Sequence, residues 1–274
     1  MPVSDEQILI LCKTYPSPSE KYVETSCVAG IRTDGSLIRL FPVPFRLVKA
    51  DKQFKKWQFV SAKVEKARKD HRPESYQIKI DTLECEENPL PTKNHWLARR
   101  NALKNTSVAQ SFSEVETARL ETGQSLALLK PARLVGLDIE PVKPAEWTDE
   151  EVAKLVAEQR QGALFEDDQV DIRTLRKLPH AFYYRYECEL PDKSCESFRH
   201  KVVDWEIGAL YWRCAKDYGD AWEPKFRQKM WDYMITRDVF FVMGNIHRFP
   251  AQWLIVSILY PPTEVSSSQA DLFS

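Results

Sequence analysis

The sequence predicts an α+β protein, with a β-rich N-terminal small barrel or curled sheet followed by a mixed α/β C-terminal half that contains an antiparallel strand pair. Two observations favour this fold class. Short apolar or alternating segments follow one another closely within about the first eighty residues, as they do in small barrels. Behind them, helical spacing and strand-like runs share the chain. With 43% hydrophobic residues among 274, the chain can bury a substantial core.

The N-terminal strands are expected at several places. Residues 8–12 form a short apolar run suited to a buried strand. Residues 25–41 fit a hairpin, because the turn at 33–36 offers Gly35 where a positive φ is expected. Residues 57–66 and 76–83 alternate apolar and polar side chains, which is typical of strands with one buried face.

The rest of the chain is predicted to mix helices and strands. Helical spacing covers residues 96–104, 113–120, 148–160, 202–218 and 222–234. Capping boxes are expected at Ser113 to Glu116 and at Thr148 to Glu151. Strands are expected at 133–139 and 181–188, and an antiparallel pair at 239–243 and 253–259. These segments suggest a basic β-rich domain at 1–90, an α+β domain at 91–262 and a flexible tail at 263–274.

Charge is distributed unevenly along the chain. The formal net charge is only −1, yet residues 39–79 carry twelve Lys or Arg against four Asp or Glu. Residues 138–171 carry eleven acidic residues against three basic ones. Such an uneven charge distribution can steer a polyanion to one face, although two solvated faces would give the same pattern.

The sequence predicts a cytoplasmic protein. No apolar run is long enough for a membrane span, and the N-terminus lacks a signal-peptide pattern. Six cysteines are too few for a disulfide framework in a chain of this length.

The basic N-terminal region is interleaved with aromatic residues. Cations neutralise phosphates and aromatic faces stack on bases, which is what single-stranded or distorted DNA requires. The alternative is that the aromatic residues are core and the lysines solvated. The predicted nucleic-acid-binding residues are Arg39, Arg46, Lys55, Lys56, Trp57, Arg68, Lys69, Arg72 and Tyr76.

Two acidic pairs are candidate catalytic groups. Asp70 and Glu74 share a loop with Arg72 and could activate water, but their charges could equally pair within the turn. Asp204 and Glu206 would share one face of an extended run and could bind Mg²⁺ for phosphodiester hydrolysis. A helix is also expected to begin there, and acidic residues favour a helix N-terminus without any catalysis.

A zinc site is a further candidate. Cys188, Cys195 and His200 place two thiols and an imidazole within a short span, and Zn²⁺ takes such ligands tetrahedrally. The fourth ligand could be Cys214 or His247, brought close only by the fold. Unconnected reduced cysteines are the alternative. The cofactor is thus unknown, with zinc or magnesium possible.

The end of the chain reads as a polar arm with an apolar anchor. Pro261 and Pro262 end a strand-like run, and the serines at 266–268 form a polar spacer before Gln269-Ala270-Asp271-Leu272-Phe273. This pentapeptide resembles the bacterial sliding-clamp-binding motif. The resemblance implies that Gln269 makes polar contacts on the clamp while Leu272 and Phe273 fill a hydrophobic pocket. An ordinary frayed terminus is the alternative.

The body of the chain also resembles a bacterial family to which no function is attached. The stretches that carry this resemblance are residues 24–31, 39–46, 70–76 and 204–206. This resemblance implies no activity. The tail and the basic N-terminal region together favour a bacterial DNA-associated protein of replication, repair or anti-phage defence, tethered to the sliding clamp. A DNA-acting enzyme, either a metal-dependent nuclease or a glycosylase, is one alternative. A protein-interaction adaptor without DNA affinity is another.

Overall fold

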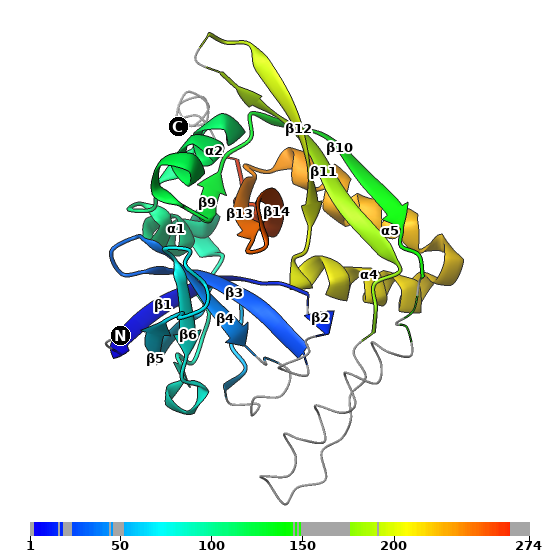
Figure 1. Ribbon diagram of the computed structural model, residues 1–274. Helices are drawn as coiled ribbons and strands as arrows, with labels where there is room; N and C mark the ends of the chain where they lie inside the picture. Colours follow the sequence, from blue (N-terminus) through cyan, green and yellow to red (C-terminus); the bar gives the residue numbers. More distant parts are fainter. Residues whose placement is uncertain are drawn as a thin grey trace, which may run out of the picture.

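The computed structural model describes residues 3–15, 17–18, 24–43, 45, 52–144, 146, 148, 176–190 and 192–263. Two seven-stranded sheets organise this part of the chain, one N-terminal and one C-terminal (Figure 1). The fold is α+β, as predicted. None of the helices in these ranges is long and apolar enough to cross a membrane.

The N-terminal sheet closes into a five-stranded barrel, because β1 pairs with both β3 and β5. The order around the barrel is β1-β3-β4-β6-β5, and β2 and β7 add to β3 and β5. The bounds are β1 Val3–Lys13, β2 Ser17–Pro18, β3 Glu24–Arg32, β4 Leu37–Val43, β5 Phe59–Lys66, β6 Ser75–Ile78 and β7 Glu84–Cys85, with a 3₁₀ turn, η2, at Ile80–Thr82. The predicted hairpin at 25–41 is confirmed, with Gly35 at a φ of 86° in its turn.

The C-terminal sheet runs in the order β10-β11-β12-β14-β13-β9-β8. Its strands are β8 Val108–Ala109, β9 Leu126–Leu129, β10 Arg133–Pro141, β11 His180–Glu189, β12 Cys195–Val202, β13 Phe240–Ile246 and β14 Phe249–Leu259. The predicted antiparallel pair at 239–243 and 253–259 is confirmed as β13 and β14. The helix predicted at 148–160 lies outside the described residues.

Helices connect and cover these strands (Figure 1). They are α1 Lys93–Leu103, α2 Phe112–Thr122, α4 Trp205–Tyr218 and α5 Trp222–Arg227. Short turns follow α4 and α5: η3 Gly219–Ala221, the π-helical η4 Gln228–Asp232 and the 3₁₀ η5 Met234–Thr236. The helix predicted over 222–234 is therefore broken. The capping box predicted at Ser113 was wrong, since Ser111 is the N-cap of α2 and its Oγ accepts from the Glu114 amide.

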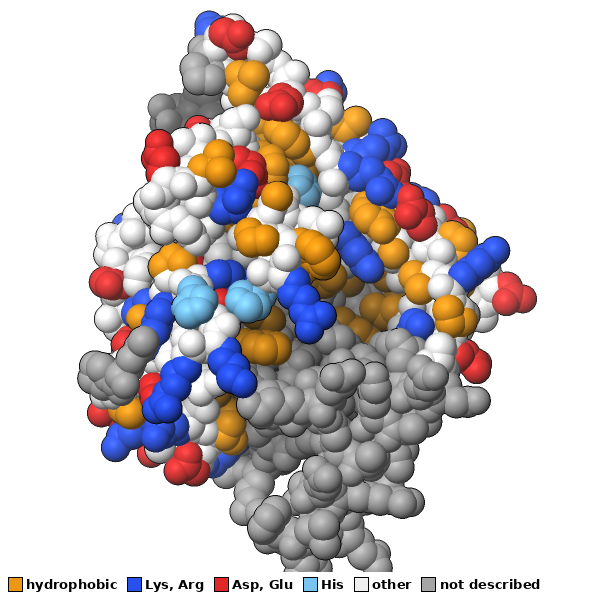
Figure 2. Space-filling model, viewed as in Figure 1, with side chains coloured by type: hydrophobic (Ala, Val, Ile, Leu, Met, Phe, Trp, Pro, Cys, Tyr) orange, Lys and Arg blue, Asp and Glu red, His pale blue; other side chains and the backbone are white. Residues whose placement is uncertain are grey.

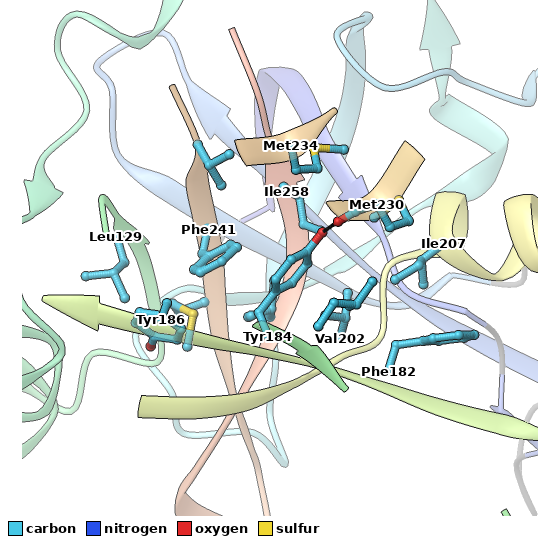
Figure 3. Packing of buried hydrophobic residues seen from close by; sticks show 14 of the residues in the cluster. Leu129, Phe182, Tyr184, Tyr186, Val202, Ile207, Met230, Met234, Phe241 and Ile258 are labelled. Atoms are coloured by element: carbon cyan, nitrogen blue, oxygen red, sulfur yellow. Dashed lines mark hydrogen bonds between the residues drawn. The ribbon is translucent and has the colours of Figure 1, made fainter. Parts of the chain in front are cut away.

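The C-terminal core is built on the inner face of its sheet and is rich in aromatic residues. Tyr184 and Tyr186 of β11 are fully buried, with Phe182 on the same face (Figure 3). Period-two alternation along β11 places all three side chains inward. The Tyr184 hydroxyl donates to the Met230 carbonyl in η4, which satisfies a buried polar group and ties the π turn to the core.

The barrel and the C-terminal half share an apolar interface. Ile8 and Ile10 of β1 point into the barrel, whereas Leu9 and Leu11 point out of it. The outward pair packs with Leu126 and Leu128 of β9 and with residues of β13 and β14. Residues 8–12 are buried on both faces for this reason, which explains why the sequence shows a continuous apolar run there.

Candidate functional site

A cleft of about 850 Å³ lies where the barrel meets the C-terminal half. Its lining comes from the turn before β5, from α1 and the residues before it, from the first turn of α4, from η4 and η5, and from the end of β14. Segments far apart in the sequence therefore form one hollow. We call it the basic cleft, because of the charges described next.

Five cationic side chains line the basic cleft and one carboxylate faces them. The cations are Lys55, Lys56, Arg99, Lys229 and Arg237, and the carboxylate is Glu206. Burial and the neighbouring Arg237 lower the pKa of Lys229, and burial lowers the pKa of Arg99. At both side chains burial outweighs the attraction of Glu206, and an anion bound in the cleft would oppose this effect of burial.

Four aromatic rings run along the same cleft. The ring of Trp57 lies 5.7 Å from that of Trp96, and Trp96 lies 5.5 Å from Tyr260. Tyr260 in turn lies 6.1 Å from Tyr233. Each neighbouring pair is within the range of favourable ring contacts, so the four rings form a continuous aromatic line.

The cations lie against these rings. The Arg99 guanidinium stands 4.4 Å from the centre of the Trp96 ring, and the Lys229 ammonium 3.6 Å from that of Tyr233. Contacts at such distances are attractive, because the ring face is negative. They hold both side chains beside the aromatic line.

The backbone around the aromatic line is held in unusual conformations. Trp57 has a φ of 67°, and the consecutive residues Asn94, His95 and Trp96 have φ values of 50°, 50° and 65°. Each non-glycine residue in the left-handed region costs on the order of 1–3 kcal/mol, and such residues cluster at functional sites. Backbone hydrogen bonds hold Trp57, whose amide donates to Ile10 at 2.7 Å and whose carbonyl accepts from Leu90 at 2.6 Å.

Lys56, a predicted nucleic-acid contact, meets the predicted catalytic pair Asp204 and Glu206. Its ammonium lies 3.5 Å from Asp204 and 3.1 Å from Glu206 and donates to the Ile258 carbonyl. Burial lowers the pKa of Lys56, but the two carboxylates outweigh that effect and raise it above its ordinary value. Both acidic residues therefore lie beside the Lys56 ammonium.

Asp204 is buried and has a structural role. Its carboxylate caps α4 by accepting from the Glu206 amide at 2.9 Å, and it also accepts from Ser257 and from the Ile258 amide. Burial raises the pKa of this carboxyl, and Lys56 opposes the shift. The catalytic role predicted for Asp204 is thereby corrected. Asp204 caps the N-terminus of α4, which was the alternative drawn from the sequence.

Arg39 and Trp57 are too deeply buried for a direct contact with phosphate, at 2% and 3% exposure. Trp57 remains part of the cleft wall, but Arg39 belongs to the junction between the two sheets. Its guanidinium donates to the Ser125 hydroxyl at 2.6 Å and to the Ser125 carbonyl at 2.8 Å. The nucleic-acid contact predicted for Arg39 is thereby corrected, because its donors are already engaged inside the protein.

The loop with Asp70, Arg72 and Glu74 is also structural. Arg72 forms a two-pronged ion pair with Asp70, at 2.9 and 2.6 Å, and donates to the Asn245 carbonyl. The Glu74 carboxylate accepts from the Ser125 amide and hydroxyl, at 3.0 and 2.6 Å. Both carboxylates are thus bound by the protein, which favours the charge-pairing alternative over water activation.

The remaining predicted contacts lie on the barrel, apart from the cleft. Arg68 is exposed and pairs with Glu65, Lys69 is exposed, and Tyr76 is covered by Arg32 and Lys66. On the face seen in Figure 2, Lys and Arg side chains are spread among acidic ones without forming a continuous stripe. Arg46 lies outside the described residues. The predicted basic surface is thus divided, and only Lys55, Lys56 and Trp57 reach the cleft.

The predicted zinc ligands do not converge. Cys188 and His200 point to the same face of the sheet, whereas Cys195 is exposed on the opposite face. The His200 ring lies 4.6 Å from Phe112 and shares a hydrogen bond with the Tyr186 hydroxyl, and burial lowers its pKa to about 4. No group of three His, Cys, Asp or Glu side chains in the described ranges is arranged to hold a metal ion. Cys195 and His200 are five residues apart in β12, and an odd separation along a strand places two side chains on opposite faces of the sheet. The prediction overlooked this alternation.

Several cleft residues were missed by the sequence reading. Arg99 and Trp96 were assigned to a helix, and Tyr233 to the buried face of another. The run from Lys225 to Arg237 interleaves basic and aromatic residues, which a helix buried in a core would not do. That pattern could have marked the run as part of a nucleic-acid-binding surface. Gln269, Leu272 and Phe273 lie outside the described residues.

Comparisons with known proteins match the sequence to two families whose descriptions name no activity. A family model described as Domain of unknown function (DUF8758) matches residues 4–105, and one described as Domain of unknown function (DUF8757) matches residues 108–274. No curated protein matches the sequence. A solved structure of a replication protein A heterotrimer bound to ssDNA is similar at 8% identity and a TM-score of 0.28, over 99% of this chain and 68% of that chain. A similarity of this degree supports no argument about fold or function.

Proposed function

We propose that this chain, which belongs to the family described as Domain of unknown function (DUF8757), binds a single strand of DNA in its basic cleft. The description of the family names no activity. In this proposal it is a bacterial DNA-associated protein of replication, repair or anti-phage defence. The observation that carries the proposal is the coincidence of five cations with four aromatic rings in one hollow.

Each part of the cleft suits one part of a strand. Lys55, Lys229 and Arg237 can neutralise phosphates, and Tyr260 offers a ring for a base, while the Tyr233 ring is covered by Lys229 and Arg237 and positions these two cations. Bases in an intact duplex are stacked inside it and cannot reach such faces, so an unpaired strand is the better ligand. Nothing in the arrangement of Asp204, Glu206 and Lys56 favours a nuclease, and we propose no reaction.

A binding titration tests this proposal. Fluorescence anisotropy with a labelled single strand and the matched duplex is expected to show tighter binding of the single strand, weakening steeply with salt. Lys229→Ala removes one cation from the cleft and should weaken binding about tenfold at low salt. It should also reduce the slope of log affinity against log salt by about 0.7, the value for one contact with a single strand.

Lys225→Ala is the matched control for this experiment. Lys225 is exposed on α5, four residues from Lys229, and lies outside the basic cleft. This variant should bind like the wild type. Equal losses in the two variants would show that the cleft is not the binding surface, and no salt-dependent binding at all would favour the adaptor.

The proposal includes a tether to the sliding clamp. It is supported by the resemblance of residues 269–273 to the clamp-binding motif and by the polar spacer before them. A clamp encircles the DNA that the cleft would bind, so the two weak contacts raise each other's effective concentration. The tail thus supplies location and the cleft supplies contact with the strand.

A further inference from the structure

A second hollow adjoins the basic cleft. It has a volume of about 350 Å³ and shares three lining residues with the cleft: Glu206, Lys229 and Tyr260. Its other walls come from α4, η4, η5 and β14. We call it the side chamber. Its volume falls within the range of about 300–1,000 Å³ that holds small organic ligands in proteins.

The walls of the side chamber are largely apolar. Ile207, Met230, Met234 and Ile258 line it, and each is no more than 6% exposed. Figure 3 shows these four side chains at one end of the C-terminal core. Methionine side chains adapt their shape to a flat guest, and their sulfur atoms make favourable contacts with aromatic rings.

Polar groups stand at the rim of this chamber. The Glu206 side chain is 53% exposed, and its Oε2 accepts from Lys56 at 3.1 Å. Within the described part of the chain, Oε1 of Glu206 accepts no hydrogen bond, and the exposed Arg213 makes no ion pair. The rim therefore offers one acceptor and, with Lys229, two donors to the edge of a guest.

We propose, building on the function proposed above, that the side chamber receives one base of the bound strand, turned out of the stack, while the phosphates stay in the basic cleft. Glu206 accepts a hydrogen bond from an N–H of this base, and Arg213 donates to its ring nitrogen or carbonyl oxygen, while Lys229 stays with the phosphates at the mouth of the chamber. The preferred ligand is therefore DNA in which a base leaves the stack easily, either a single strand or a duplex with a mismatch.

The chemistry of the chamber fits a base better than other parts of a nucleic acid. Arg213 and Lys229 could attract a phosphate to the rim, but a phosphate inside the chamber would meet the apolar side chains of Met230 and Met234, which do not compensate its charge. A base is flat, apolar on both faces and carries donors and acceptors only at its edge. It requires apolar walls and a mixed polar rim, which is the arrangement found here.

The test compares three DNA molecules with the full chain. They are a labelled perfect duplex, the same duplex with one central mismatch, and a single strand, each titrated by fluorescence anisotropy. The wild type is expected to bind the mismatched duplex about tenfold more tightly than the perfect one, since a mismatched base costs less to turn out. Ala209→Trp fills the chamber from an exposed position on α4 and should abolish this preference without changing the salt dependence.

Two further variants complete the test. Ala251→Trp makes the same substitution at an exposed position of β14 outside both hollows, and should keep the preference. Glu206→Gln keeps the shape of the rim but weakens the acceptor, and should reduce the preference several-fold even if Ala209→Trp fails to fold.

The outcomes separate the two proposals. Equal binding of both duplexes by the wild type, with salt-dependent binding of the single strand intact, overturns the side chamber and leaves the basic cleft standing. A preference that survives Ala209→Trp in folded protein also overturns it. Absence of salt-dependent binding to all three molecules overturns the proposed function itself.

Discussion

Lys56 forms ion pairs with both Asp204 and Glu206. Its side chain is only 10% exposed and contacts both carboxylates and a backbone carbonyl. A buried charge of this kind is stable only while its partners remain. Lys56 therefore joins the barrel to the start of α4 as well as closing one side of the basic cleft.

Removing this lysine should destabilise the protein strongly. Lys56→Met leaves the buried Asp204 without its cation, and breaking a buried pair in this way costs about 3–5 kcal/mol of unfolding free energy. Urea unfolding followed by circular dichroism measures the loss. Lys55→Met, at the exposed neighbouring position, should change stability by no more than about 0.5 kcal/mol. Similar values for the two variants would contradict the structural role given to Lys56.

At the level of single residues, the sequence showed which ionisable and aromatic side chains are present but not which of them contact one another in the fold. Lys56 and Glu206 are 150 residues apart, and no local spacing connects them. Arg39 looked like a surface cation, yet its donors are engaged by Ser125, 86 residues away. Burial and pairing of this kind depend on the tertiary fold, so composition and local charge excess cannot reveal them.

Among the elements, the start of α1 is the least ordinary. Within the first turn of this element, Asn94, His95 and Trp96 take left-handed conformations in succession, although none is glycine. Periodicity predicted a helix over residues 96–104 but no strained turn at its start, because nothing in the sequence there requires a positive φ. The turn positions Trp96 against Trp57 and Tyr260, and so builds the aromatic line.

Glycine substitutions test whether this turn is strained. His95→Gly removes the steric cost of a positive φ, which offsets the extra freedom that glycine gives the unfolded chain. Ala98→Gly, within α1, should lower the unfolding free energy by about 1 kcal/mol. We expect His95→Gly to be more stable than Ala98→Gly by about 1–2 kcal/mol in urea titrations. A His95→Gly variant as unstable as Ala98→Gly would contradict the left-handed turn.

For the molecule as a whole, the sequence predicted the fold class well and the site only in part. Alternation and turns located most strands of the barrel, although the strand predicted over residues 76–83 ends at Ile78 and a 3₁₀ turn follows at Ile80–Thr82. The basic region led to Lys55, Lys56 and Trp57. The other side of the cleft, with Lys229, Tyr233 and Arg237, comes from the second half of the chain. The packing of β1 and β3 on β9, β13 and β14 brings the two sides together, with polar contacts such as those of Lys56 and Arg39.

The tail gives a prediction at the same scale. Leu272→Ala with Phe273→Ala removes both apolar anchors and should abolish binding to a bacterial sliding clamp. Wild-type binding should be weak, on the order of micromolar, because a short segment must be ordered when it binds. Surface plasmon resonance with immobilised clamp measures both. Unfolding and DNA affinity should stay as in the wild type.

Substitutions in the spacer provide the control for that experiment. Ser266→Ala with Ser267→Ala leaves all three motif residues in place and should bind the clamp normally. If the Leu272→Ala, Phe273→Ala variant holds the clamp as tightly as the wild type, residues 269–273 are not the anchor.

The two walls of the basic cleft also bear on how such genes can evolve. Trp57 and Trp96 belong to the region that matches one family model, and Lys229 and Tyr260 to the region that matches the other. Neither region encodes the cleft alone, so recombination that separated them would discard the site in a single event. Descendant genes that keep the cleft are therefore expected to inherit both regions together. In a lineage that retains only the barrel, the lysine and tryptophan codons of the cleft wall should accumulate substitutions without selection.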